Sequence, residues 1–259
     1  MSLLKQKLLS GKLLIGTHVN LNDLVISEIM GSLGFDFLWI DTEHTAIDYQ
    51  CLLGHLVASK ASGTPAIVRV PWNNAVFVKR VLEMGPAGIV FPMVNTAKEA
   101  EAAMRCCIYP PTGNRGFGPN RAIRYGIDDV RKYINYDSME ICRFVQVETK
   151  EAVYNLDEIA RNPYIDAFII GPYDLSGSVG QLGNVMEGET DRLIDIAIEK
   201  AHQAGKPVGV STGDNDYATL KHWLDKGIDI ISTGTKYLGI IQGARTSLNN
   251  IKKIMEEKS

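Results

Sequence analysis

The sequence predicts a single α/β domain folded as a closed (β/α)8 barrel, the TIM-barrel fold class, and three observations support this. The chain of 259 residues has the length of one such barrel. It contains eight short apolar runs, and most of these runs are separated by segments with helical spacing. This alternation is typical of parallel βα units, and eight units close a barrel. We therefore expect residues 1–259 to form one domain.

The expected strands are short, nearly continuous apolar runs, which is typical of parallel strands covered on both faces. They cover residues 13–18, 35–41, 66–70, 88–94, 141–148, 165–171, 207–212 and 228–233. Helices are expected at 74–84, 97–107, 151–161, 191–204 and 216–226, and a short amphipathic helix is expected within the first 14 residues. Gly85, Gly205 and Gly227 follow three of these helices and are expected to be C-caps.

Composition favours small-molecule chemistry in a reducing compartment. A net charge of −3 and a pI near 6.0, without a dense Lys/Arg cluster, argue against a nucleic-acid-binding surface. The four cysteines form neither a CxxC pair nor a spaced disulfide framework. Lysines interrupt the N-terminal segment, which argues against a signal peptide, and no apolar run is long enough to span a membrane. We therefore expect a cytoplasmic protein with no nucleic-acid or membrane partner.

The most informative stretch is residues 35–48, FDFLWIDTEHTAID, because an apolar strand ends there in ionisable side chains. Asp41, Glu43 and His44 stand at the carboxyl end of the expected strand, where barrel enzymes place their catalytic groups. The alternative is that Asp41 caps the next helix and that His44 is an ordinary surface histidine. Polar residues at the ends of other expected strands favour the functional interpretation.

The fifth and sixth expected strands also end in acidic residues. The fifth ends in Gln146 and Glu148, and Asp174 follows the sixth after a Gly171-Pro172 turn. Because neighbouring strand ends meet in a barrel, Glu148 and Asp174 can bind one divalent cation while water or substrate oxygens fill its other positions. Oxygen ligands favour Mg²⁺ or Mn²⁺ and also admit Co²⁺. The alternative for both acids is helix capping.

Arg69 ends the third expected strand inside an apolar run, so its guanidinium needs an anion to face. That anion is either an enolate or carboxylate oxygen of a substrate or a structural partner such as Glu43 or Glu148. The two pairings are compatible, because Arg69 can pair with Glu43 or Glu148 when the site is empty and with a substrate oxygen when it is occupied.

Four further residues are candidates for substrate binding. The backbone N–H groups of Tyr173 and Asp174 stand at a turn that leads into a helix, a position suited to a substrate carboxylate. His18 and Ser211, at the ends of the first and seventh expected strands, are expected to complete the rim as specificity residues.

The segment 109–140 is far longer than an ordinary connection between a helix and a strand. It is rich in glycine and arginine, a composition suited to a loop that faces an anion. We expect it to fold over the carboxyl face of the barrel and to help select the acceptor aldehyde, with Phe117 shaping the pocket and Arg121 binding any distal carboxylate. The alternative is that the segment only forms a subunit contact.

Taken together, these motifs resemble those of the HpcH/HpaI aldolase family of class II pyruvate aldolases. The resemblance covers nearly the whole chain, and six motifs carry it: DTEH at 41–44, VRVPWN at 68–73, VFPMV at 90–94, YPPTGNRGFG at 109–118, QVET at 146–149 and GPYDLS at 171–176. It implies a (β/α)8 barrel that cleaves a 4-hydroxy-2-oxo acid to pyruvate, or a related 2-oxo acid, and an aldehyde. It also implies a divalent metal ion and no Schiff-base lysine.

The resemblance carries roles onto individual positions of this sequence. Glu148 and Asp174 match the metal ligands, Arg69 matches the residue that stabilises the enolate, His44 with Asp41 matches the acid/base pair, and Gln146 matches the pyruvate-contacting glutamine. In the implied mechanism His44 removes the proton of the 4-hydroxyl through a metal-bound or ordered water molecule, and Asp41 orients its ring and favours the protonated form.

The sequence departs from the family's pattern at His18, Phe117 and Ser211, which we expect at the aldehyde end of the site. The natural aldehyde therefore stays open, because aldolases for heptanedioate, deoxy-sugar acids and other hydroxy-oxo acids share the same core. Related aldolases assemble as hexamers, and a homo-oligomer is expected here from the resemblance alone.

Two other functions are compatible with part of the sequence. Ser211-Thr212-Gly213 follows the seventh strand and Ser232-Thr233-Gly234 follows the eighth, where many barrels bind phosphate, and this would suggest a phosphosugar isomerase. That function explains neither the paired carboxylates nor the buried arginine. The second alternative is a non-catalytic barrel that only binds a 2-oxo acid and a metal ion.

Overall fold

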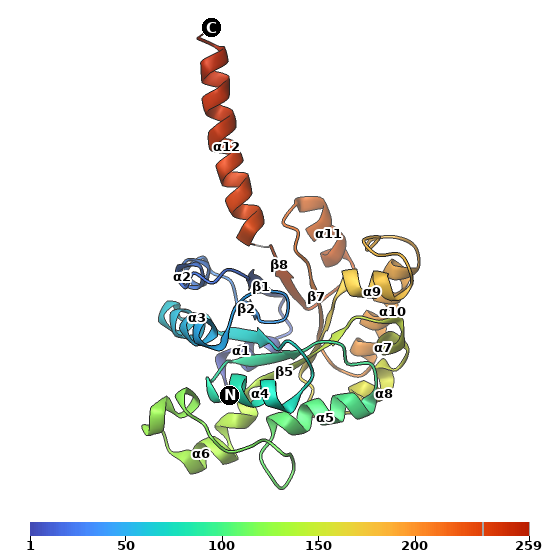
Figure 1. The fold of residues 1–259 in the computed structure, drawn as a ribbon. Coiled ribbons are helices and arrows are strands. Elements are labelled where there is room, and N and C mark those ends of the chain that lie inside the picture. The colour runs from blue at the N-terminus through green and yellow to red at the C-terminus, as the bar shows by residue number, and fades with distance from the viewer. Residues whose placement is uncertain (235, 259) are drawn as a thin grey trace.

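The computed structural model describes residues 1–234 and 236–258, and its centre is a closed barrel of parallel strands in the order β1 to β8 (Figure 1). The strands are β1 (Leu14–Val19), β2 (Phe37–Asp41), β3 (Ala66–Arg69), β4 (Gly88–Phe91), β5 (Cys142–Val147), β6 (Ala167–Ile170), β7 (Val208–Ser211) and β8 (Ile230–Thr233). Each strand pairs with its sequence neighbours, and β1 also pairs with β8. The predicted (β/α)8 barrel is therefore confirmed.

Two layers of apolar side chains hold the barrel together. Inside it pack large side chains such as those of Trp39, Phe144 and Ile169, and α1 (Leu3–Leu8) closes its amino end with Leu4 and Leu8. A second layer lies between the strands and the surrounding helices. Because most of the strands are covered on both faces, they appear in the sequence as continuous apolar runs.

The helices that surround the barrel lie close to the predicted segments. They are α2 (Val25–Ser32), α3 (Tyr49–Ser62), α4 (Ala75–Glu83), α5 (Ala97–Cys107), α7 (Lys150–Tyr154), α8 (Leu156–Ala160), α9 (Pro172–Ser178), α10 (Gly188–Gln203) and α11 (Tyr217–Asp225). The predicted helix 151–161 is divided at Asn155 into α7 and α8. Gly85, Gly205 and Gly227 have φ angles of 70°, 69° and 79°, so these expected C-caps take the left-handed conformation that glycine adopts most easily.

The long segment 109–140 lies at the amino end of the barrel, away from the carboxyl ends of the strands (Figure 1). It contains the 3₁₀ helix η1 (Arg121–Gly126), α6 (Val130–Asn135) and the 3₁₀ helix η2 (Asp137–Glu140). Tyr109, Ile123 and Tyr133 form a small core of its own, and the backbone N–H of Ser2 donates to the Glu140 carboxylate. The predicted position over the carboxyl face is therefore wrong, because the chain leaves α5 at the amino end and finds its contacts there.

The helix α12 (Lys236–Glu256) departs from the barrel. Figure 1 shows it leaving the end of β8 and extending away from the rest of the molecule. None of its described residues is buried. No helix within residues 1–234 and 236–258 combines the length and the apolar character that crossing a bilayer would need.

Candidate active site

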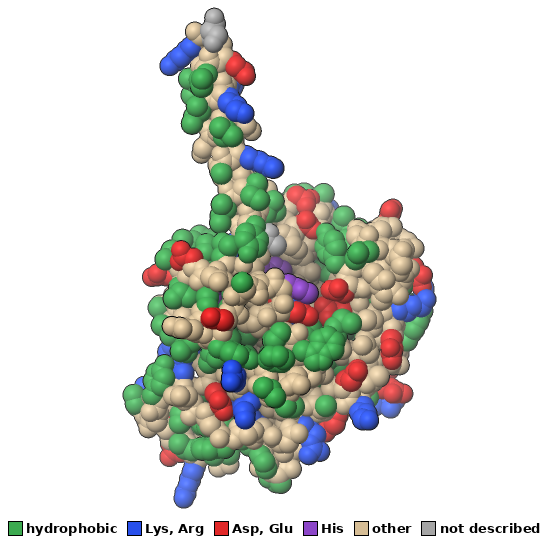
Figure 2. Space-filling view, viewed as in Figure 1, with side chains coloured by type: hydrophobic (Ala, Val, Ile, Leu, Met, Phe, Trp, Pro, Cys, Tyr) green, Lys and Arg blue, Asp and Glu red, His purple; other side chains and the backbone are tan. Residues whose placement is uncertain are grey.

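A cavity of about 210 Å³ opens at the carboxyl ends of the strands, where the sequence predicted the site. Figure 2 shows histidine and acidic side chains gathered in a hollow of this face. The cavity is lined by residues from six strands or the loops that follow them: His18, Asn20, Asp41, His44, Arg69, Gln146, Glu148, Gly171, Pro172, Tyr173, Asp174, Ser211 and Gly213. All the predicted site residues except Phe117 and Arg121 are therefore brought together.

Asp41 and Arg69 form the most constrained pair in the site. They are register partners on β2 and β3, and Arg69 donates from Nε to Asp41 Oδ1 at 2.9 Å and from Nη2 to Oδ2 at 2.7 Å. Asp41 Oδ1 also accepts from the backbone N–H of Glu43 at 3.0 Å. Burial alone would raise the pKa of Asp41, but the hydrogen bonds and charge of Arg69 hold that pKa below its usual value. Asp41 is therefore a charged anchor for the guanidinium.

Glu43 is a third member of this cluster. Its Oε2 lies 3.0 Å from Nη1 of Arg69. Burial raises the pKa of Glu43 to about 7, and although the charge of Arg69 opposes this shift, the charges of Asp41 and Asp174 add to it. The sequence singled out Glu43 as part of the charged end of β2 and as one of two candidate structural partners of Arg69. The structure places it between Arg69 and His44.

His44 differs from its predicted arrangement. Its side chain is 64% exposed, and its Nε2 lies 3.7 Å from Oε2 of Glu43. In the part of the chain that the structure describes, Asp41 accepts from the backbone N–H of His44 at 3.4 Å, and no hydrogen bond joins Asp41 to the imidazole. The expectation that Asp41 orients the ring is therefore not met, because both carboxylate oxygens of Asp41 are bound by Arg69. Glu43 is the carboxylate that lies beside the imidazole.

Glu148 is buried at the carboxyl end of β5 and held at both oxygens. Oε1 accepts from Nε2 of Gln146 at 2.6 Å, and Oε2 accepts from the backbone N–H of Met93 at 2.9 Å. Met93 has a φ of 52°, an uncommon backbone conformation for a residue other than glycine. A Cβ atom on Gly171 would come within 2.7 Å of Glu148 Oε1, so only glycine leaves room for this carboxylate.

The surroundings of Glu148 fit a cation. Burial raises the pKa of Glu148 to about 7; the Met93 N–H and Arg69 oppose the shift, and the negative charges of Glu43 and Asp174 increase it. Asp174 lies exposed in the first turn of α9.

The ligand set near Glu148 is small. The Oε1 atom of Gln146 is buried and has no hydrogen-bond partner among the residues that the structure describes. No group of three or more His, Cys, Asp or Glu side chains within the described residues is placed to hold a metal ion. Glu148 and Asp174 would therefore be two protein ligands of an ion that takes its other oxygens from water or substrate, as Mg²⁺ commonly does.

The opposite wall of the cavity carries the predicted specificity residues. Nε2 of His18 lies 3.0 Å from Oγ of Ser211, and the imidazole packs edge-on against the ring of Trp39. Burial and the charge of Arg69 lower the pKa of His18 to about 4, so its imidazole is neutral at neutral pH. Tyr173 lies on the rim and is 48% exposed.

Asn20 also lines the cavity, and sequence reasoning missed it. Its position two residues beyond His18, just past the end of β1, was the signal that could have pointed to it.

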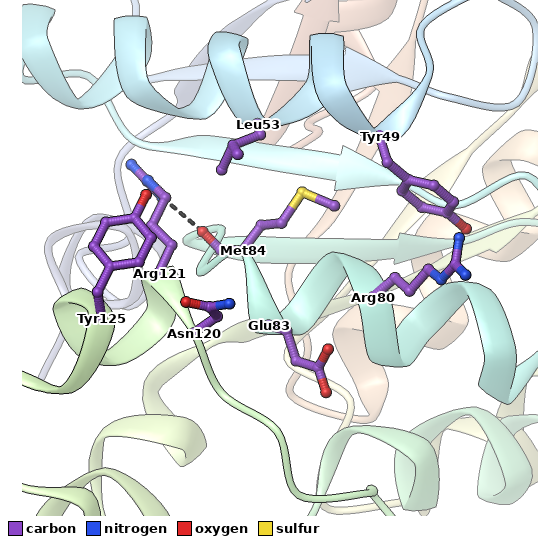
Figure 3. A pocket seen from close by; sticks show the side chains of 8 residues that line it. All are labelled: Tyr49, Leu53, Arg80, Glu83, Met84, Asn120, Arg121 and Tyr125. Carbon is purple, nitrogen blue, oxygen red and sulfur yellow. Dashed lines mark hydrogen bonds between the residues drawn. The ribbon is translucent and has the colours of Figure 1, made fainter.

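Phe117 and Arg121 lie elsewhere. Arg121 donates from Nη1 to the carbonyl of Met84 at 2.6 Å and from Nη2 to the carbonyl of Leu56 at 2.8 Å. Figure 3 shows Arg121 and Met84 beside an outer cavity between α3, α4 and η1. Phe117 is 63% exposed and packs near Tyr109. Their predicted placement in the substrate pocket is wrong, because the segment that carries them stays at the amino end of the barrel.

Comparison with known proteins identifies the family. A model of the family described as HpcH/HpaI aldolase/citrate lyase matches residues 14–241. The chain belongs to this family. It is 35% identical over 228 residues to a hydroxypyruvate/pyruvate aldolase of Roseobacter denitrificans, covering 88% of each chain. It is 34% identical over 230 residues to a 4-hydroxy-2-oxo-heptane-1,7-dioate aldolase of Shigella sonnei, covering 89% of this chain and 87% of the relative.

A solved structure of a family member agrees with the fold. The HpcH/HpaI aldolase/citrate lyase family protein from Burkholderia cenocepacia superimposes with a TM-score of 0.89 at 29% identity, covering 96% of this chain and 98% of the other. This HpcH/HpaI family member is therefore a carbon–carbon lyase, a class II aldolase of the pyruvate type. The relatives are named for different substrates, so family membership by itself leaves the substrate of this aldolase open.

Proposed function

We propose that this aldolase cleaves a 4-hydroxy-2-oxo acid reversibly to an aldehyde and pyruvate, or a closely related 2-oxo acid such as hydroxypyruvate. The observation that carries the proposal is that an acid pair suited to a cation, Glu148 and Asp174, shares one cavity with Arg69. A 2-oxo acid needs positive charge at its carboxylate and at the keto oxygen that becomes an enolate, and this cavity is arranged to supply it. The names of the relatives support the same class of substrate.

Glu148 and Asp174 would hold a divalent cation, with Mg²⁺ or Mn²⁺ the preferred ions for oxygen ligands and Co²⁺ a third candidate. A cation bound there supplies Lewis-acid stabilisation to the oxygen that gains negative charge during the reaction. Gln146 is the proposed contact to the substrate. Its buried Oε1 has no donor among the described residues and can accept from a substrate hydroxyl or a water molecule, while its Nε2 donates to Glu148.

Arg69 is suited to donate to the developing enolate oxygen. A guanidinium has five N–H groups. Nε and one N–H of Nη2 donate to Asp41, and Nη1 faces Glu43, so one N–H on each of Nη1 and Nη2 is left for a substrate. Because two carboxylates fix the guanidinium before substrate arrives, no reorganisation is needed when charge develops.

His44 is the proposed acid/base group. In the cleavage direction it takes the proton of the substrate's 4-hydroxyl, directly or through a water molecule; the C3–C4 bond then breaks, the aldehyde leaves, and the electron pair forms the enolate. The enolate takes a proton at C3 to give the 2-oxo acid. The exposed imidazole stands at the cavity mouth, beside Glu43, where it can reach an entering aldehyde.

Cation removal tests the proposal most directly. Release of pyruvate from a 4-hydroxy-2-oxo acid should stop when the protein is treated with EDTA and should return when Mg²⁺, Mn²⁺ or Co²⁺ is added. The reverse condensation, screened with a panel of aldehydes and with pyruvate or hydroxypyruvate, identifies the natural pair. Full activity after complete removal of divalent cations would contradict the proposed use of a cation.

Asp174→Ala tests whether Asp174 is a ligand of the cation. This variant should lose cation affinity, measured by calorimetric titration, together with turnover. Glu158→Ala, which removes an exposed acid on α8, is the matched control and should retain both. An unchanged cation affinity in Asp174→Ala would remove Asp174 from the cation site.

A further inference from the structure

The wall of the cavity that faces Glu148 carries uncharged polar side chains. Strand β1 stands four strands away from β5 in the closed ring, so its carboxyl end lies across the cavity from Glu148. His18 lies in β1, Asn20 directly follows it, and Ser211 ends β7. All three side chains line the cavity. The function proposed above gives them no role, although they can form hydrogen bonds with a substrate.

His18 and Ser211 form a pair that can still donate and accept one hydrogen bond each way. Nε2 of His18 lies 3.0 Å from Oγ of Ser211, and neither side chain has another hydrogen-bond partner among the described residues. If the Ser211 hydroxyl donates to Nε2, the pair keeps Nδ1–H as a donor and the Ser211 oxygen as an acceptor. If Nε2–H donates instead, the pair keeps the hydroxyl as a donor and Nδ1 as an acceptor. Either arrangement is the complement of a hydroxyl group, which also has one donor and an acceptor oxygen.

Packing and burial fix the position and the charge of this pair. The imidazole of His18 packs edge-on against the ring of Trp39, with 5.5 Å between the ring centroids. Burial and the charge of Arg69 lower the pKa of His18 to about 4, although the charge of Asp41 opposes this shift, so the imidazole is neutral at neutral pH. A neutral pair binds a neutral hydroxyl without the cost of desolvating a charge.

Asn20 adds hydrogen-bond donors to the same wall. Its Oδ1 accepts from the backbone N–H of Lys236 at 3.3 Å. Because a backbone N–H must face the amide oxygen, this contact determines which end of the amide is the NH2 group. That NH2 group has no hydrogen-bond partner among the described residues and can donate to an oxygen of a ligand in the cavity.

The cavity offers no free cation to a second carboxylate of the substrate. Among the described residues that line it, three are acidic, Asp41, Glu148 and Asp174, and one is basic, Arg69, which is already bound by carboxylates. Lys236 contacts Asn20 but does not line the cavity. The 2-oxo acid brings one carboxylate of its own. An aldehyde with a further carboxylate would place an unpaired charge in the site, which is costly.

The aldehyde is the part of the substrate that reaches this wall. In the proposed reaction the 2-oxo acid end is held on the side of Glu148, and His44, which follows β2, takes the proton of the 4-hydroxyl. The carbon that bears this hydroxyl becomes the aldehyde carbon, so it lies towards the end of β2. Strand β1 pairs with β2, and the rest of the aldehyde therefore extends towards His18.

We propose that His18, Ser211 and Asn20 bind hydroxyl groups of the aldehyde, so that the natural acceptor of this aldolase is an uncharged hydroxyaldehyde. An apolar aldehyde would leave these polar groups without partners when it displaces water, and an aldehyde with its own carboxylate would meet no free cation. This inference rests on the proposed function and names the class of aldehyde that the same site takes.

The test is the condensation of pyruvate with matched aldehydes by the full-length enzyme in the presence of a divalent cation. 2-Hydroxypropanal is compared with 2-methylpropanal, and 3-hydroxypropanal with butanal, so that each pair differs only by a methyl group in place of a hydroxyl. In at least one pair kcat/KM should be about 10-fold or more higher for the hydroxyaldehyde, because the methyl group leaves polar side chains of the cavity without partners.

Variants separate recognition of the hydroxyl from the intrinsic reactivity of the aldehydes. Ser211→Ala removes one member of the pair, and His18→Phe keeps a ring against Trp39 but removes both nitrogens. Each variant should reduce the preference for the hydroxyaldehyde by about 10-fold, whereas an intrinsic difference in reactivity would persist. Ser32→Ala, the same change at an exposed serine of α2, is the matched control and should keep the wild-type preference. Denaturant titration checks that each variant is folded, and Ser211→Ala decides alone if His18→Phe is not.

A second comparison tests the charge of the aldehyde. 4-Oxobutanoate carries a distal carboxylate, and its methyl ester has the same chain without the charge. The value of kcat/KM should be about 10-fold or more higher for the ester, because no free cation within the described lining of the cavity faces the carboxylate.

The outcomes separate this inference from the proposed function. Condensation of any of these aldehydes with pyruvate supports the proposed function. If condensation occurs but the folded variants keep the wild-type preferences, or if 4-oxobutanoate is used as well as its ester, the inference is wrong and the function stands. An effect of Ser211→Ala that appears only when hydroxypyruvate replaces pyruvate would place the bound hydroxyl on the 2-oxo acid and would also overturn the inference. Absence of condensation with every aldehyde would reject both.

Discussion

Arg69 is the residue whose surroundings most limit its role. Both carboxylates at the end of β2 contact it, and only two of its five N–H groups remain for a substrate. Lysine keeps the charge but cannot contact Asp41 through two parallel N–H donors. Arg69→Lys should therefore mainly lower kcat, because an interaction with the enolate oxygen strengthens as negative charge develops. Steady-state kinetics of pyruvate release measure this effect.

The variant Asp41→Asn is a second test of this prediction, because Asp41 is the hydrogen-bond partner of the Arg69 guanidinium. Asp41→Asn should give a kinetic profile like that of Arg69→Lys, since Asp41 contacts Arg69 and the described structure has no hydrogen bond from it to the His44 imidazole. An effect of Arg69→Lys confined to KM would make Arg69 a simple binding group.

His44 is predicted to move the proton of the 4-hydroxyl. His44→Ala should lower the rate of aldol cleavage by about 10²- to 10⁴-fold, the usual contribution of a general acid/base group. Exchange of the pyruvate methyl protons with deuterium probes proton transfer without an aldehyde and should also slow. Wild-type rates in both assays would assign the role to another group, and Glu43 is the neighbour to test next.

The sequence could predict which single residues share the cavity but not every contact among them. Glu148 and Asp174 were paired from sequence because they end consecutive strands, and parallel strand ends meet at one edge. Asp41 was assigned to His44, three residues away, whereas the structure gives both of its oxygens to Arg69, 28 residues away. A short separation in the sequence does not determine which cationic side chain binds a carboxylate in the folded protein.

At the scale of elements, the segment 109–140 shows where composition misleads. Its arginines and glycines suited an anion-facing loop, yet Arg121 binds the carbonyls that end α4 and a carbonyl of α3. Composition indicates that an arginine needs acceptors, but backbone carbonyls satisfy that need as well as a substrate does. Helix α5 ends at the amino end of the barrel, and the segment 109–140 that follows it covers that end.

A stability effect is therefore predicted for Arg121. Arg121→Ala removes the side-chain donor from the part-buried carbonyls of Met84 and Leu56 and should lower the free energy of unfolding by about 1 kcal/mol, measured by denaturant titration. It should leave kcat/KM equal to that of the wild type for charged and for neutral aldehydes. Arg124→Ala is the control, because Arg124 is exposed and should leave stability nearly unchanged. A selective loss with dicarboxylic substrates would instead return Arg121 to the substrate site.

At the scale of the whole molecule, the neutral His18 makes stability depend on pH. Its pKa is lowered to about 4 in the folded state from an ordinary value near 6.5, so between these values the unfolded chain binds a proton that the folded chain does not. The stabilising contribution is complete above the ordinary pKa and is lost as pH falls towards about 4.

His18→Gln should therefore reduce the pH dependence of stability. Between roughly pH 7 and pH 5 the wild type should lose on the order of 1 kcal/mol more unfolding free energy than the variant, a value reduced for the partial exposure of the imidazole. Chemical denaturation at both pH values measures the difference. Equal losses in the two proteins would mean that His18 titrates in the folded state much as it does in the unfolded chain.

The sequence by itself determined the barrel, the order of its strands and most of the residues at their carboxyl ends. It could do so because a period of apolar runs separated by helical segments is a local pattern, and because closure of parallel strands brings all their ends to one face. The partner of Asp41, the face covered by residues 109–140 and the direction of α12 were decided only by tertiary structure. Each depends on contacts between residues far apart in the chain, such as Arg121 with Leu56 or Lys236 with Thr17, and no local pattern specifies which of several competing acceptors lies within reach.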